Sequence, residues 1–62
     1  MTTPPVKRVL IADDSADDRE MVARAMPAAF VVREAATVAE AAALLETEDF
    51  FVALVDLSLI HI

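Results

Sequence analysis

Three short apolar runs alternate with two stretches of helical periodicity along this chain. The first run, Val9–Ala12, is continuous and is followed directly by two acids. A second run starts with FVVREA at Phe30, and a third, again continuous, covers Phe51–Asp56. Short apolar runs without alternation are typical of strands that are covered on both faces, as in a parallel sheet. The pattern therefore predicts three strands, the first and third of them buried.

The segment between the first two runs predicts a helix. Ser15 can cap its first turn, and the acids that follow suit the positive end of the helix dipole. Pro27 ends the helix because proline cannot continue the hydrogen-bond pattern. One face carries an apolar stripe that we predict to be part of the core: Met21, Val22, Ala25 and Met26.

A second helix is predicted between the second and third runs. It begins with TVAE, Thr37–Glu40, which matches the capping box, in which the threonine and glutamate side chains each accept from a backbone N–H. The helix is expected to bury Ala41, Leu44 and Leu45 and to end near Glu48. The resulting order of strand, helix, strand, helix, strand implies right-handed crossovers and a parallel three-stranded sheet of the α/β class.

Acidic residues stand where the first and third strands end. Asp13 and Asp14 follow the first strand, and Asp56 ends the third. The carboxyl ends of parallel strands share one edge of the sheet, where open α/β folds bind their ligands. If the first and third strands are neighbours, the three carboxylates converge there.

Converging carboxylates repel one another, and this repulsion is relieved by protonation or by a bound divalent cation. An all-oxygen ligand set without histidine or cysteine suits a hard ion, Mg²⁺ in particular. A Mg²⁺ ion beside a carboxylate also favours phosphoryl chemistry, in which an aspartate attacks phosphorus and forms an acyl phosphate. The sequence thus indicates a magnesium-dependent phosphoryl site at this edge.

Composition narrows the class of protein. With 62 residues, the chain forms one domain at most, and with no cysteine it has neither disulfides nor a thiolate metal site. Its apolar runs are shorter than the ~20 residues of a membrane span, and residues 1–8 lack the hydrophobic region of a signal peptide, so we expect a cytoplasmic protein without a membrane partner. The net charge of −6 argues against nucleic-acid binding.

Three segments together resemble the N-terminal half of a response-regulator receiver domain, the phosphoacceptor module of two-component signalling. They are VLIADDSADDREMV, EAATVAEAAALL and FVALVDLSL, within residues 7–59. The resemblance implies a flavodoxin-like, doubly wound parallel sheet, here truncated to β-α-β-α-β with strand order 2-1-3. It also implies a signalling module rather than an enzyme, with a histidine kinase or a phosphotransfer protein as its partner.

The same resemblance implies the role of each site residue. Asp56 matches the phosphoacceptor, and Asp13 and Asp14 match the acid pair that binds Mg²⁺. Ser58 matches the position whose main-chain carbonyl contacts the metal. The hydroxyl residue and the lysine that receivers carry after their fourth and fifth strands have no counterpart here, so we expect this chain to be inactive or weakly active.

The ends of the chain are expected to lie outside the domain. Residues 1–6 form a short tail before a partial receiver domain at residues 7–59. The last six residues, LSLIHI, resemble the in-frame translation of a transposase end sequence used in sequencing adapters, so we expect Leu57–Ile62 to be a non-native tail. The third strand would then be an open sheet edge, and we expect the chain to be unstable or to self-associate.

Two other functions are open to this pattern. A Mg²⁺-dependent hydrolase of the aspartyl-phosphate type uses a second aspartate two residues after the nucleophile, where this chain has Ser58. A receiver-like interaction domain without phosphorylation would not need all three acids. In a purely structural interpretation, Asp13 and Asp14 serve the helix dipole and Asp56 is a turn residue.

Overall fold

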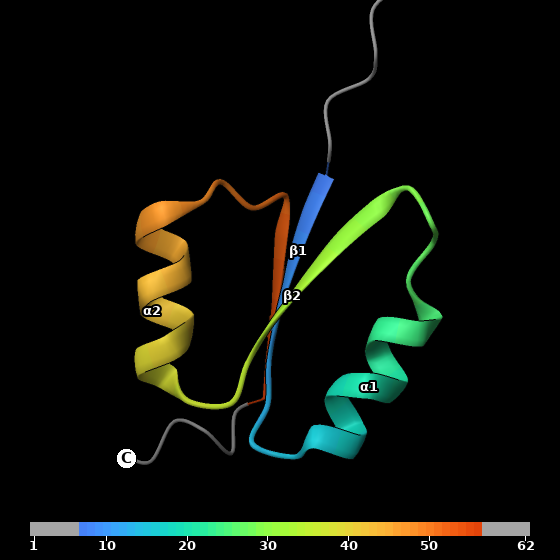
Figure 1. The fold of residues 1–62 in the computed structure, drawn as a ribbon, viewed down its shortest axis with the longest axis horizontal. Helices are drawn as coiled ribbons and strands as arrows, with labels where there is room; N and C mark the ends of the chain where they lie inside the picture. Colours follow the sequence, from blue (N-terminus) through green and yellow to red (C-terminus); the bar gives the residue numbers. More distant parts are fainter. Residues whose placement is uncertain (1–6, 57–62) are drawn as a thin grey trace, which may run out of the picture.

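The computed structural model describes residues 7–56 and contains the five elements in the predicted order (Figure 1). They are β1 (Lys7–Ala12), α1 (Ala16–Ala25), β2 (Phe30–Ala35), α2 (Val38–Thr47) and β3 (Val52–Val55). The predicted tail at residues 1–6 and the predicted non-native tail at residues 57–62 lie outside the described residues.

The strands form one parallel sheet in the order β2-β1-β3. β1 pairs with β2 from Lys7↔Phe30 to Ala12↔Ala35, and with β3 from Val9↔Val52 onwards. Figure 1 shows α1 and α2 on opposite sides of the sheet, with the carboxyl ends of all three strands at the bottom of the view. The predicted flavodoxin-like arrangement, doubly wound with strand order 2-1-3, is therefore confirmed.

The core is centred on β1, the middle strand. Val9, Leu10, Ile11 and Ala12 are all buried, which confirms the prediction of a strand covered on both faces. Below α2, Leu10 and Ala12 form a cluster with Ala35 of β2 and Ala41 of α2, and Leu44 and Phe50 pack against this cluster. The central strand thus supplies most of the apolar burial on which the sheet depends.

β3 differs from the prediction of a buried strand. All four of its residues are exposed, with Val52 and Leu54 each 39% exposed. The reason is that α1 packs mainly against β1 and α2 against β1 and β2, so within residues 7–56 the two faces of β3 have little cover. β3 is also an edge strand, which pairs with β1 on one side only among these residues. An apolar run predicts a strand, but it does not predict which neighbours the strand finds.

Fewer residues of the predicted apolar stripes are buried than the sequence predicts. Met21 in α1 is 64% exposed and Leu45 in α2 is 53% exposed, whereas Val22 is half-buried and Ala41 is buried. α1 packs against β1, and α2 packs against β1 and β2. A ten-residue helix on such a narrow sheet buries one row of side chains, so the flanking apolar positions remain in contact with water.

The helix caps form largely as the sequence predicts. Ser15 Oγ accepts from the Asp18 N–H at 3.3 Å, and Thr37 Oγ1 accepts from the Glu40 N–H at 3.1 Å. The Glu40 carboxylate, however, accepts from the N–H of Ala36 at 2.8 Å, one residue before the cap. Both caps fix the points at which the chain leaves the carboxyl edge of the sheet.

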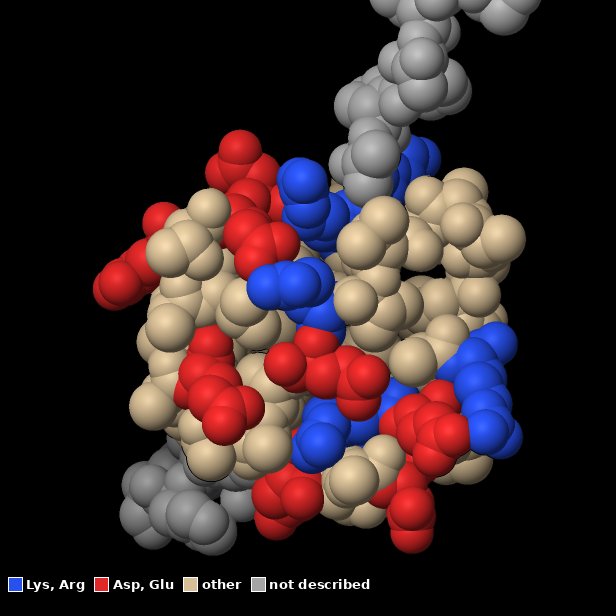
Figure 2. Space-filling view, in the orientation of Figure 1, with Lys and Arg blue, Asp and Glu red and all other residues tan. Residues whose placement is uncertain are grey.

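Acidic and basic side chains are interspersed on the face shown in Figure 2. Glu48, which follows α2, pairs with Arg33 of β2 at 3.0 Å and with Arg8 of β1 at 3.7 Å. These partly exposed pairs contribute little to stability, but they offset the negative charge of α2. Within residues 7–56, neither helix has the length and apolarity needed to cross a membrane.

Candidate functional site

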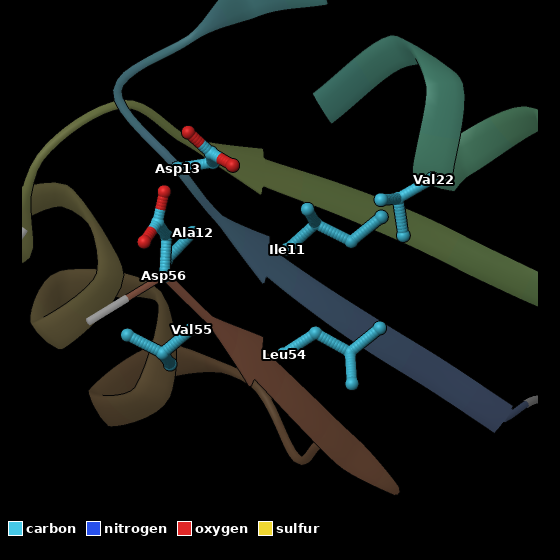
Figure 3. A pocket seen from close by; sticks show the side chains of 7 residues that line it. All are labelled: Ile11, Ala12, Asp13, Val22, Leu54, Val55 and Asp56. Carbon is cyan, nitrogen blue, oxygen red and sulfur yellow. The ribbon is translucent and has the colours of Figure 1, made fainter. Parts of the chain in front are cut away.

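Three aspartates meet at the carboxyl edge of the sheet. Asp13 follows β1 directly, Asp14 is the next residue, and Asp56 follows β3 directly. One carboxylate oxygen from each lies within 4.8 Å of the other two. Because β1 and β3 are neighbours, the structure brings these three predicted site residues together, and Figure 3 shows Asp13 and Asp56 extending from adjacent strand ends.

The sheet itself holds two of these aspartates. The Asp56 N–H donates to the carbonyl of Ala12 at 2.8 Å, which extends the β1–β3 ladder by one hydrogen bond. The Asp13 N–H donates to the carbonyl of Ala35 at 3.0 Å, which does the same between β1 and β2. The backbone of both aspartates is therefore held in place by hydrogen bonds to the neighbouring strand.

The turn between β1 and α1 is held by further hydrogen bonds around Asp13. Its Oδ1 accepts from the backbone N–H of Ser15 at 2.9 Å, and its carbonyl accepts from Nη1 of Arg19 at 2.6 Å. Arg19 Nε also donates to Glu34 Oε1 of β2 at 3.2 Å. The sequence reasoning missed Arg19; its signal is the single basic residue in the acidic stretch ADDRE.

The carboxylates differ in exposure. Asp13 and Asp56 are half-buried, while Asp14 is exposed. Half-burial strengthens electrostatic interactions because the effective dielectric constant is lower than in bulk water. Exposure of Asp14 leaves one side of the cluster accessible to water and to an incoming ligand.

The donor set fits Mg²⁺. The three ligand oxygens come from carboxylates, and Mg²⁺ prefers hard oxygen ligands while keeping several of its waters. Ligand oxygens around an octahedral Mg²⁺ lie about 3 to 4 Å apart, comparable with the spacing of the cluster. Asp13, Asp14 and Asp56 would therefore be the side chains that hold the ion. Ser58, predicted to contribute a carbonyl, lies outside the described residues.

An open pocket of about 240 Å³ adjoins the carboxylates. Asp13 and Asp56 line its polar end, and the rest is apolar, with Ile11 and Leu54 from the sheet opposite Val22 of α1 (Figure 3). The pocket lies on the α1 side of the sheet, next to the exposed strand β3. A reactant that approaches Asp56 from this side meets an apolar wall and two carboxylates at one end.

No family model, curated protein or solved structure matches this chain. The fold and the carboxylate geometry are therefore the basis of the functional proposal.

Proposed function

We propose that this chain is a receiver module of a response regulator, in which Asp56 accepts a phosphoryl group in the presence of Mg²⁺. The observation that supports it best is the convergence of Asp13, Asp14 and Asp56 at the carboxyl ends of β1 and β3. This edge is where open α/β sheets bind ligands. The receiver-like motifs in the sequence carry the same three residues.

In the proposed reaction, a carboxylate oxygen of Asp56 attacks the phosphorus of a phosphohistidine. The new oxygen–phosphorus bond forms as the phosphorus–nitrogen bond breaks, and the imidazole nitrogen keeps the electron pair. Asp56 then carries an acyl phosphate. A bound Mg²⁺ supplies charge neutralisation for the phosphoryl oxygens and the surrounding carboxylates.

The two remaining aspartates have a different role in this proposal. Asp13 is held at its N–H, its carbonyl and its Oδ1, which suits a residue that must keep a fixed position for a cation. Asp14 adds a second carboxylate on the exposed side of the cluster. Asp56 comes from a different strand, so a phosphoryl group on it lies beside the acid pair.

The proposal includes a cytoplasmic signalling role with a histidine kinase or a phosphotransfer protein as donor. It includes no nucleic-acid contact for this segment, since the chain has a net charge of −6 and its basic side chains are interspersed with acidic ones. The module is proposed as a phosphoacceptor in a relay rather than as an enzyme with a turnover of its own.

The test is phosphorylation of the full chain by a small phosphoramidate with Mg²⁺, read by mass spectrometry of the intact protein and of its peptides. We expect little labelling, because the hydroxyl residue and the lysine of receivers have no counterpart here, and any adduct should be confined to Asp56 and lost in Asp56→Asn. Omission of Mg²⁺ should abolish it. A phosphoryl adduct on another residue, or labelling of Asp56 that is equal with and without Mg²⁺, would contradict the proposal.

A further inference from the structure

We propose that Arg19 is a positioning residue for the carboxylate site, because its guanidinium fixes the β1–α1 turn between the backbone of Asp13 and the side chain of Glu34. This inference rests on the proposed function for its consequence in Mg²⁺ binding. The geometry of the turn, however, is testable without any metal.

The Arg19 side chain is largely shielded from water, and its guanidinium donates in two directions. Nη1 donates to the Asp13 carbonyl at 2.6 Å, and Nε donates to Glu34 Oε1 at 3.2 Å. The Arg19 side chain is 17% exposed, whereas that of Arg24 on the same helix is 77% exposed and pairs with Glu20. Through these two bonds, Arg19 joins α1, β2 and the end of β1.

The bond to the Asp13 carbonyl acts on Asp14 as well. That carbonyl belongs to the rigid, planar peptide unit that contains the N–H and Cα of Asp14. The N–H of Asp13 is fixed by Ala35, so a second fixed point at its carbonyl sets the direction in which the chain leaves β1. Arg19 thereby orients the backbone from which both carboxylates of the acid pair start.

The guanidinium of Arg19 lies next to the acid pair but does not bind the carboxylates of the cluster. Within residues 7–56, the guanidinium of Arg19 donates to a main-chain carbonyl and to Glu34, and not to a carboxylate of the cluster. The guanidinium therefore does not compete with a cation for the carboxylate oxygens of the cluster. The rigid fork of arginine suits this two-way contact, which the single ammonium of lysine does not reproduce.

The decisive comparison is Arg19→Met against Arg24→Met in the full chain. Both variants remove one positive charge from the same helix, so they share the changes in net charge and in helix composition. We measure Mg²⁺ affinity by NMR titration and hydrogen exchange of the Ser15 amide, which donates to Asp13. Arg19→Met should weaken Mg²⁺ binding about tenfold and accelerate exchange at Ser15, and Arg24→Met should change neither.

Three further variants separate positioning from charge and from folding. Arg19→Lys keeps the charge, so it should show the same faster exchange at Ser15 if the two-way contact is what matters. Glu34→Gln keeps an oxygen acceptor for Nε and should behave as the unaltered chain, while Glu34→Leu should shift both measurements towards Arg19→Met. Glu34 is 46% exposed, so these changes test the contact even if Arg19→Met fails to fold.

Equal exchange at Ser15 in Arg19→Met and Arg24→Met, or full rescue by Arg19→Lys, would overturn the inference. The two proposals fail in different ways. If the unaltered chain binds no Mg²⁺, the proposed function is wrong, while exchange at Ser15 still decides whether Arg19 positions the turn.

Discussion

The backbone N–H of Asp56 donates to the carbonyl of Ala12, so the proposed phosphoacceptor is joined to the last residue of the central strand. Asp13 follows Ala12 directly along the chain. Ala12 therefore connects the two aspartates. Its carbonyl accepts the hydrogen bond from Asp56, and its peptide bond leads to Asp13. The relative placement of Asp13 and Asp56 depends on this pairing of β1 with β3.

Asp13→Asn should reduce Mg²⁺ affinity about tenfold or more, because it removes one charge from a ligand set whose attraction for the ion is electrostatic. Isothermal titration of the full chain with MgCl₂ measures this. Glu46→Gln on the exposed side of α2 makes the same change in net charge away from the site and serves as the control. An equal loss in both variants would mean that the effect is one of total charge.

Mg²⁺ should raise the melting temperature of the chain, since a ligand that binds only the folded state stabilises it by mass action. At a concentration 100 times its dissociation constant, the gain is about 2.7 kcal/mol. Thermal unfolding followed by circular dichroism, with and without a chelator, measures the shift. NaCl at equal ionic strength is the control for screening, and a shift of the same size in NaCl or in Asp13→Asn would contradict a specific site.

Leu10→Ala should destabilise the chain by about 2–5 kcal/mol, because Leu10 is fully buried below α2 and its truncation leaves a cavity. For a domain of this size, that loss is a large fraction of the total stability. Leu45→Ala makes the same chemical change at a side chain that is 53% exposed, and should cost about 0.5 kcal/mol or less. Urea unfolding measures the change in the free energy of unfolding for both variants. Similar changes would mean that Leu10 is not a central residue of the core.

Val52→Lys should reduce self-association of the chain. Val52 is an exposed residue of β3, whose outer edge has no strand partner within residues 7–56, and a charge on an open edge opposes pairing with another copy. Sedimentation velocity over a range of concentrations measures the change. Val38→Lys places the same charge at an exposed position of α2, and it should leave association unchanged if the β3 edge is the contact.

The sequence predicted the fold well because its dominant signals are local and mutually consistent. A continuous apolar run such as Val9–Ala12 needs cover on both faces, and the caps at Ser15 and Thr37 mark where each helix begins. These signals predict the order of the elements and, with the right-handed crossover rule, a parallel sheet. The strand order 2-1-3 was predicted from the resemblance to receiver domains and not from these local signals.

Burial outside β1 was less predictable, because it depends on which elements lie opposite each residue. Met21 and Leu45 have the same apolar character as core residues, yet only a small sheet lies below their helices. Arg19 was missed for a related reason. Its partners, the carbonyl of Asp13 and the side chain of Glu34, come together only through tertiary structure, and a main-chain acceptor leaves no mark in the sequence.

The pairing of Asp56 with Ala12 has a kinetic consequence. Asp13 and Asp56 lie near opposite ends of the described chain, so their meeting requires closure of a long loop through both helices, and such non-local contacts slow folding. We expect the carboxylate cluster to be completed only when β3 docks, late on the folding path. Mg²⁺ should then slow unfolding while leaving the refolding rate nearly unchanged, a pattern that stopped-flow measurements detect. The metal would thereby select molecules in which the whole sheet has assembled.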